Sequence, residues 1–176
     1  IGDYSVKIQD QILAQGEVLS AKLVVFLLNQ KGISAKLADT RELIITDSNF
    51  GDAQPLDTIS KKNIIQIFKE NKDSVLVITG FIGSNAKNET TTLGRNGSNY
   101  TASLIANYIN AEELQNFTHV DGIYTANPEL VLDAKKIGSL SYSEANEMAN
   151  FGANILRQSL LSKEISTPSK TVNQSS

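Results

Sequence analysis

The sequence predicts an α/β fold in which helices cover both faces of a mostly parallel β-sheet, a three-layer αβα sandwich. Short apolar segments rich in Val and Ile alternate along the chain with longer segments whose apolar residues recur at helical spacing. The 176 residues, 40% of them hydrophobic, suffice for one domain with its own core. We expect that domain over residues 1–160 and a polar tail or linker over residues 161–176.

The first half of the chain supplies two helices and three strands. Apolar spacing predicts a helix over residues 17–31 that ends at Gly32, and its core-facing residues would be Leu19, Leu23, Phe26, Leu27 and Gln30. Strands are expected over residues 33–38 and 42–46. A second helix, capped by Asp57 or Thr58, would run to Asn71 with Ile64, Ile65 and Phe68 facing inward. The continuous apolar run over residues 74–79 is typical of a parallel strand buried on both faces.

The second half begins with a glycine turn, in which Gly94 and Gly97 flank Arg95. Ser98 would cap the following helix, predicted over residues 101–111. A strand is expected over residues 114–120, then a loop over 121–128, and a helix capped by Ser143 that runs through Met148. Residues 1–15 resemble the approach to a helix more than an opening strand, so we expect an N-terminal portion of the domain to be missing.

Composition excludes several classes of function. A net charge of −3 and a pI near 5.2 leave no broad basic surface, so nucleic-acid binding is not expected. There is no cysteine and one histidine, so neither a disulfide framework nor a Cys/His zinc site can form, and no protein-held metal is expected. The longest apolar runs are far shorter than the roughly 20 residues of a membrane helix. We expect a cytoplasmic protein with no membrane partner.

The turn around Arg95 is the strongest local candidate for a binding site. A helix that begins at glycines directs unpaired backbone N–H groups and the positive end of its dipole toward the turn, which favours an anion. The planar guanidinium of Arg95 fits a carboxylate or a pair of phosphate oxygens. The alternative is an ordinary glycine turn capped by Ser98 with an exposed arginine.

Several motifs resemble those of one superfamily, in the same order along the chain. Thr118-His-Val-Asp-Gly-Ile-Tyr-Thr-Ala-Asn-Pro128 resembles the nucleotide-side loop of amino acid kinases, and Leu93-Gly-Arg-Asn-Gly-Ser-Asn-Tyr100 resembles the aspartate-binding element of aspartokinases. The latter has the form common in bifunctional aspartokinase/homoserine dehydrogenases. Weaker similarities occur around Glu17, over residues 79–83 and over residues 141–153, so the resemblance runs from about Ile12 to Leu156.

The resemblance implies an amino acid kinase (carbamate kinase-like) fold and transfer of the γ-phosphoryl group of Mg-ATP to the side-chain carboxylate of L-aspartate. Arg95 would bind an aspartate carboxylate, Glu17 would face the substrate ammonium, and Ser98 with Asn99 would complete the catalytic end of the site. The implied nucleotide-binding residues are Thr118, His119, Tyr124, Asn127 and Asn154. Mg2+ would be held mainly by the nucleotide. Analogy with the family also implies a homo-oligomer, and a fused homoserine dehydrogenase or regulatory domain outside this chain.

Each implied role has a structural alternative. Glu17 could offset a helix dipole, Tyr124 could be a core aromatic residue, Asn127 could serve the turn before Pro128, and His119 could be structural. The chain also departs from the family pattern. Asn99 stands where aspartate is usual, Glu129 where an arginine is frequent, and Asn154 where lysine is common. Residues after Leu156 depart as well, and the Lys-x-Gly-Gly motif of the superfamily is absent from the sequence.

Two other functions therefore stay open. The altered positions could mark a module that senses an amino acid or a nucleotide without catalysis. The strand over residues 75–79 followed by Gly80-x-x-Gly83 could instead belong to a dinucleotide-binding domain, although a third glycine and the acidic ribose contact are missing.

Overall fold

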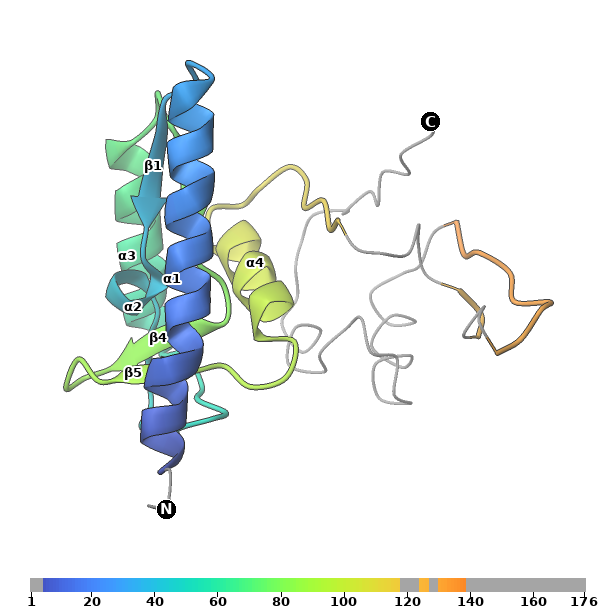
Figure 1. Ribbon diagram of the computed structural model, residues 1–176, viewed down its shortest axis with the longest axis horizontal. Helices are drawn as coiled ribbons and strands as arrows, with labels where there is room; N and C mark the ends of the chain where they lie inside the picture. The colour runs from blue at the N-terminus through green and yellow to red at the C-terminus, as the bar shows by residue number, and fades with distance from the viewer. Residues whose placement is uncertain (1–4, 118–123, 127–129, 139–176) are drawn as a thin grey trace. The chain divides into compact units, whose positions relative to one another are not determined.

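A computed structural model describes residues 5–117, 124–126 and 130–138 (Figure 1). The chain divides into two compact units, Ile1–Ile109 and Asn110–Ser176, and each is described by itself. The helices described in the first unit are α1 (Val6–Gln30), α2 (Thr40–Leu43), α3 (Asp57–Glu70) and α4 (Gly97–Tyr108). Its described strands are β1 (Ala35–Ala38), β2 (Ile45–Thr46), β3 (Val75–Ile78), β4 (Ile82–Asn85) and β5 (Thr90–Thr92).

Parallel pairing dominates the sheets, as predicted. β1 pairs with β3 in parallel, with Ala35 opposite Val75, and β2 pairs with β4 in parallel. α1 lies in front of the strands and α3 behind them in Figure 1. The α/β fold class is therefore confirmed. The prediction missed the antiparallel β4–β5 hairpin, because both strands are short and their buried residues are mostly polar, as at Ser84, Asn85 and Thr91.

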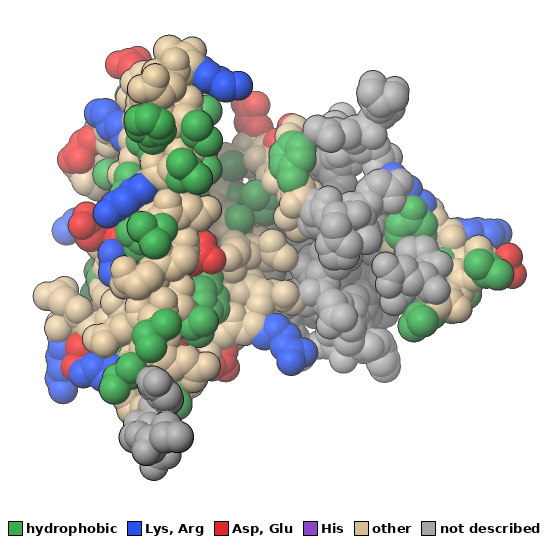
Figure 2. All heavy atoms as spheres, in the orientation of Figure 1, with side chains coloured by type: hydrophobic (Ala, Val, Ile, Leu, Met, Phe, Trp, Pro, Cys, Tyr) green, Lys and Arg blue, Asp and Glu red, His purple; other side chains and the backbone are tan. Residues whose placement is uncertain are grey.

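The helix predicted from Glu17 begins earlier, at Val6, where Ser5 accepts a hydrogen bond from the backbone N–H of Ile8. Its inward face was also predicted wrongly. The buried residues are Asp10, Ala14, Val18 and Ala21, whereas Leu19, Leu23, Phe26 and Leu27 are at least half exposed. Figure 2 shows hydrophobic side chains along the outer surface of this helix. Small side chains let the strands approach α1 closely. Because apolar residues also occupy other sides of the helix, spacing alone selected the wrong face.

By length and composition alone, α1 could cross a membrane. The lengths of the uninterrupted apolar runs did not predict this. Gly16, Glu17 and Lys22 break those runs without lowering the average hydropathy of the helix much. In this structure α1 packs against β1, β3 and β5, and its buried Asp10 is hydrogen-bonded to Gly51 and Thr92. We interpret α1 as a helix that packs on the β-sheets, and not as a membrane-spanning helix.

Two local predictions differ from the structure between the end of α1 and the start of α3. The strand expected over residues 42–46 is replaced by α2 and the two-residue strand β2, because Asp39 caps a helical turn by accepting from the N–H of Arg41. α3 begins after Leu56, so Asp57 lies in its first turn and neither Asp57 nor Thr58 caps it. Within α3, Ile64 is buried as predicted.

β3 is parallel, as predicted, but it is not buried on both faces. Val75 is 49% exposed and the other residues of β3 are half-buried. Among the described strands, β3 has only β1 as a neighbour, which leaves its other edge uncovered there. The glycines that follow it lead into strand β4 and not into a helix. This rules out the dinucleotide-binding interpretation of Gly80-x-x-Gly83, in which a helix must begin at the glycines.

The second unit is described only in part. Residues 114–117 form no strand, and residues 118–120 of the predicted strand lie outside the described residues. An isolated antiparallel bridge joins Tyr124 to Lys136, and Thr125 N–H donates to the carbonyl of Lys135 at 2.9 Å. The helix predicted from Ser143 and the polar tail over residues 161–176 also lie outside the described residues.

Candidate functional site

The first unit contains an open cavity of about 720 Å3 beyond the carboxyl end of β3. Its walls come from one face of α1, the segment after β3, the end of β5 and the first turn of α4. The lining residues are Gln9, Asp10, Leu13, Glu17, Gly51, Phe81, Thr92, Gly94, Arg95, Asn96, Gly97, Ser98 and Asn99. Glu17, Arg95, Ser98 and Asn99, all predicted as site residues, therefore lie around the same cavity.

α1 contributes two carboxylates to the cavity wall. Asp10 and Glu17 are seven residues apart, which is close to two helical turns and places them on the same face. Asp10 is 1% exposed, and its two oxygens accept hydrogen bonds from Gly51 and Thr92. Glu17 is half-buried. The internal hydrogen bonds of Asp10 occupy both of its oxygens, so Glu17 is the acid that can bind a ligand.

Glu17 lies against the chain segment that leaves β3. Burial raises the pKa of Glu17 above its ordinary value, and a hydrogen bond from the backbone N–H of Gly80 partly offsets this effect. Gly80 also approaches α4 closely, because a Cβ atom added there would lie 3.0 Å from Oγ of Ser98. Glu17, Gly80 and Ser98 therefore converge at one side of the cavity.

The turn that carries Arg95 depends on glycine at Gly94. Gly94 has φ +70°, and a Cβ atom added there would lie 2.3 Å from Oδ1 of Asp52. Both the conformation and the space thus require glycine. Arg95 itself is exposed. The two ion pairs among the described residues are Lys7–Glu89 and Arg41–Asp39, and Arg95 takes part in neither.

The cap of α4 differs from the prediction. Asn96 is the N-cap, in the left-handed conformation with φ 58° and ψ 23°, and Ser98 is already inside the helix. Ser98 was expected to cap because the pattern places a hydroxyl next to glycine, but the cap lies two residues earlier, at Asn96, and the helix begins at Gly97. The Asn96 side chain makes no capping hydrogen bond. The first-turn N–H groups near Ser98 and Asn99 are therefore not capped by that side chain, which suits an anion at the cavity.

Phe81 has an unusual backbone conformation at the cavity wall. Its φ is +69°, and the N–H of Ile82 donates to the carbonyl of Gly80 at 2.8 Å across it. A bulky residue with positive φ is strained unless its surroundings hold it in place. Thr101 Oγ1 accepts from the N–H of Phe81, and the carbonyl of Phe81 accepts from the N–H of Leu93 at 2.8 Å. This conformation fixes the cavity wall to both β5 and α4.

The cavity combines a half-buried carboxylate with an exposed guanidinium. Such a site can bind a small zwitterion, with its ammonium group near Glu17 and a carboxylate near Arg95. The described residues contain no group of three or more His, Cys, Asp or Glu side chains that could hold a metal ion. The opposite charges of Glu17 and Arg95 therefore fit an amino acid.

None of the predicted nucleotide-binding residues belongs to the described part of the first unit, which contains the cavity. Tyr124 lies in the second unit, where it is half-buried and its backbone bridges to Lys136. Thr118, His119, Asn127 and Asn154 lie outside the described residues, as do Glu129 and the loop around Asp121. Their proposed roles stay predictions.

Sequence reasoning missed Asp10 and Gly51 in the cavity wall, and it gave no individual role to Phe81 or Thr92, which lie in segments that it had singled out. A helix start placed at Glu17 removed Asp10 from consideration. The seven-residue spacing of Asp10 and Glu17 would have identified a shared helix face if the start had been placed at Ser5. The wall also comes from segments distant in the sequence, and no local pattern predicts that Gly51 and Thr92 meet Asp10.

Comparison with known proteins gives consistent matches over most of the chain. The model of the amino acid kinase family matches residues 3–162. Lysine-sensitive aspartokinase 3 of Escherichia coli strain K12 is 37% identical over 153 residues, which cover 86% of this chain and 34% of that protein. Bifunctional aspartokinase/homoserine dehydrogenase 2 of Arabidopsis thaliana is 35% identical over 156 residues, which cover 88% of this chain and 17% of that protein.

Comparison with solved structures also finds aspartokinases. The fold superposes on the crystal structure of E. coli aspartokinase III in complex with aspartate and ADP (R-state) with a TM-score of 0.85 and 36% identity, covering 90% of this chain and 36% of that one. The chain thus spans about a third of the length of the E. coli aspartokinase and 17% of the length of the bifunctional enzyme. The parallel α/β architecture, the cavity beyond β3 and these matches lead to one conclusion: the chain belongs to the amino acid kinase family.

Proposed function

We propose that this chain is part of an aspartate kinase, which transfers the γ-phosphoryl group of Mg-ATP to the side-chain carboxylate of L-aspartate and gives 4-phospho-L-aspartate and ADP. The observation that carries the proposal is the convergence of Glu17, Arg95 and Ser98 on one cavity, in a chain similar to aspartokinases over most of its length. The structure of E. coli aspartokinase III with aspartate and ADP supports both substrates by similarity.

In the proposed mechanism the acceptor needs no general base, because the side-chain carboxylate of aspartate is already ionised at neutral pH. The chain contributes positioning and charge. Arg95 binds one carboxylate, Glu17 accepts hydrogen bonds from the ammonium group, and the start of α4 around Ser98 and Asn99 stabilises negative charge at the reacting end. Mg2+ bound to the triphosphate supplies charge neutralisation at the transferred group.

The direct test is an ADP-release assay on the natural full-length protein, with ATP and Mg2+, in the presence and absence of L-aspartate. We expect ADP release that depends on aspartate, together with an acyl phosphate that hydroxylamine traps as a hydroxamate. ATP hydrolysis that ignores aspartate would contradict the proposal. Aspartate or ATP binding measured by calorimetry, without turnover, would favour the sensing module instead. Asn99 is relevant to this outcome, because it lines the cavity at a position where the family usually has aspartate.

We further propose that the protein acts in the cytoplasm as a homo-oligomer, in the first step of lysine, threonine and methionine biosynthesis. Homologues include bifunctional aspartokinase/homoserine dehydrogenases, so a second enzyme or a regulatory domain in the same polypeptide is part of the proposal. Light scattering on the full-length protein tests the assembly, and an assay of homoserine oxidation tests the second activity.

A further inference from the structure

Asp10 is a buried carboxylate that the proposed mechanism does not use. It is 1% exposed, and a buried charge is costly unless it is fully hydrogen-bonded. Oδ2 accepts from the N–H of Gly51 at 2.9 Å and from the N–H of Thr92 at 3.0 Å, and Oδ1 accepts from Oγ1 of Thr92 at 2.8 Å. These donors lie 41 and 82 residues away in the sequence. One side chain therefore joins α1 to two distant segments.

Both segments support the turn that carries Arg95. Thr92 is the last residue of β5, and its carbonyl accepts from the N–H of Ala53 at 2.9 Å. Gly51 precedes Asp52, whose carboxylate packs against Gly94. The carboxylate of Asp10 thus holds the segment that enters the turn and the loop that lies against it.

The same helix carries Glu17, about 10 Å farther along its axis at 1.5 Å per residue. Any shift of α1 relative to the end of β5 would change the separation between Glu17 and Arg95. These two side chains bear the opposite charges that would bracket a zwitterion. Because both oxygens of Asp10 are engaged by internal donors, its contribution to binding is geometric.

We propose that Asp10 is a positioning residue that sets the spacing between Glu17 and Arg95, and so the affinity of the site for its amino acid substrate. The proposal rests on the proposed aspartate kinase function. It assigns Asp10 no proton transfer and no contact with the reacting atoms.

The first experiment replaces Asp10 in the natural full-length protein and measures KM for aspartate, KM for ATP and kcat. Asp10→Ala leaves three donors without their acceptor, and we expect the aspartate KM to rise about 10-fold or more while the ATP KM changes less than about threefold. Asp10→Asn should recover most of this loss. Its amide oxygen can accept from both N–H groups, while its NH2 donates to Oγ1 of Thr92 after the hydroxyl rotates.

Ser60→Ala is the matched control for general destabilisation. Ser60 is fully buried, and its hydroxyl is hydrogen-bonded to the backbone of Ile45, outside the cavity. We expect this variant to lower the melting temperature without changing the aspartate KM. If Asp10→Ala and Ser60→Ala both lower the melting temperature and neither changes the aspartate KM by more than about twofold, Asp10 is only structural and the proposal is overturned.

A second pair of variants decides the question if Asp10→Ala does not fold. Thr92→Val removes only the hydroxyl donor to Oδ1, and Thr92→Ser restores it. We expect Thr92→Val to raise the aspartate KM by about 3- to 10-fold and Thr92→Ser to reverse the change. Equal KM values for the two variants would refute the role of Asp10. If the wild-type protein does not release ADP in response to aspartate, both the proposed function and this inference fail. If the wild-type protein is active but the Asp10 and Thr92 variants keep its aspartate KM, only the inference fails.

Discussion

Arg41 and Arg95 each follow the end of a strand, but their surroundings differ. Arg41 comes soon after β1, and its Nε donates to Oδ1 and Oδ2 of Asp39 at 3.0 and 3.1 Å. Arg95 comes soon after β5 and forms neither of the ion pairs found among the described residues. One guanidinium is engaged within the fold, while the other is left exposed at a cavity.

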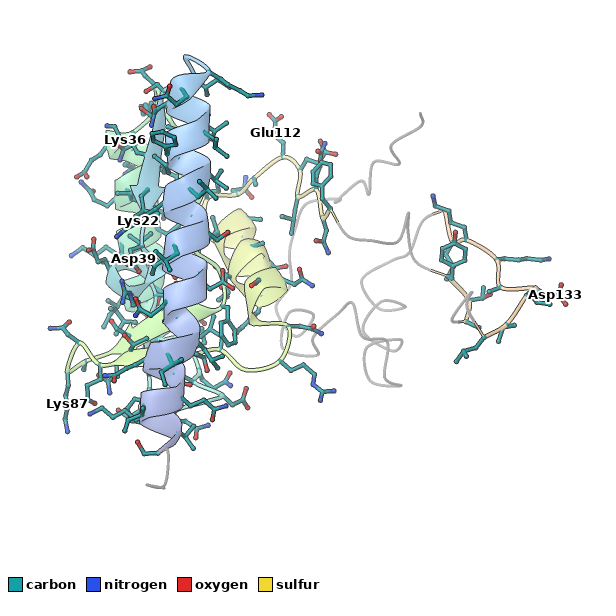
Figure 3. The ribbon with its side chains drawn as sticks, in the orientation of Figure 1. Lys22, Lys36, Asp39, Lys87, Glu112 and Asp133 are labelled. Atoms are coloured by element: carbon teal, nitrogen blue, oxygen red, sulfur yellow. The ribbon has the colours of Figure 1, made fainter. Side chains whose placement is uncertain are left out.

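The difference comes from the distance in the sequence to the nearest suitable acid. Asp39 is two residues from Arg41, and it also caps α2 through the N–H of Arg41. Lys22 of α1 adds a favourable charge near Asp39, and both side chains are labelled in Figure 3. Glu17, the half-buried acid on the cavity wall, belongs to another element and accepts a hydrogen bond from the backbone N–H of Gly80 instead. A local pair stabilises structure, whereas separated charges around a cavity are available to a ligand.

The largest expected effect comes from removing the cavity cation. Arg95→Ala should raise the aspartate KM by about 100-fold and change the ATP KM by less than about threefold, because a charge-assisted pair with a carboxylate is lost. Steady-state kinetics on the full-length protein measures both constants. Lys87→Ala, at the exposed tip of the β4–β5 hairpin (Figure 3), removes an equal charge elsewhere and should change neither. Equal increases in both KM values for Arg95→Ala would refute the assigned role.

Removing the cavity acid should have the next largest effect. Glu17→Gln keeps an oxygen for the N–H of Gly80 but loses the charge that faces the ammonium group, so we expect the aspartate KM to rise about 10-fold at pH 7. The raised pKa of Glu17 also predicts a pH dependence. As the pH falls through that pKa, wild-type Glu17 takes up a proton and its aspartate affinity should fall, while the Gln variant should show no such titration.

The stability of the Glu17 variant separates binding from folding. A raised pKa means that ionised Glu17 is disfavoured in the folded state, so its contribution to stability is full below its ordinary pKa and is lost as the pH rises through the folded-state pKa. Glu17→Gln should therefore be no less stable than wild type at pH 7 in urea unfolding. A large loss of stability would indicate that Glu17 supports the fold more than the ligand.

The turn that carries Arg95 should be more sensitive to an added methyl group than the interior of α1. Gly94→Ala places Cβ 2.3 Å from Asp52 Oδ1 at a positive φ, and we expect a loss of about 1–2 kcal/mol of unfolding free energy together with a higher aspartate KM. Chemical denaturation and kinetics test the two parts. Gly16→Ala is the control, because Gly16 lies within α1 with open space around its Cβ position, and it should not destabilise the protein.

The sequence predicted the parts of this molecule that depend on local signals. The residues around Arg95 are contiguous, so their pattern could be compared directly with a family motif, and β1, β3 and α3 followed from apolar runs and periodicity. Glu17 was identified because it also lay in a recognisable segment. Its position around the same cavity as Arg95 agrees with the resemblance, although its role stays a prediction.

The errors arose where local signals were weak or ambiguous. α1 is apolar on several sides, so periodicity did not identify the side carrying Ala14, Val18 and Ala21. β5 consists of three threonines, and β2 has only two residues. Asp10 was missed because its partners, Gly51 and Thr92, are distant in the sequence. Tertiary contacts of this kind leave no periodic trace in a single sequence.

The smallest expected effect concerns the Asp39–Arg41 pair and would sharpen the contrast with Arg95. Burial opposes ionisation of Asp39, but the hydrogen bonds and charge of Arg41 outweigh it and lower the pKa of Asp39. A lowered pKa contributes stability that is present above the ordinary pKa of aspartate and is lost as the pH falls through the folded-state pKa. Asp39→Asn keeps an N-cap acceptor for the N–H of Arg41 and removes the charge, so it should cost about 1 kcal/mol or less at pH 7, since the pair is partly exposed. The difference between the two proteins in urea unfolding should shrink below about pH 4, and the aspartate KM should not change. A change in that KM would mean that Asp39 and Arg41 also serve the site, and the distinction between a structural arginine and a ligand-binding arginine would fail.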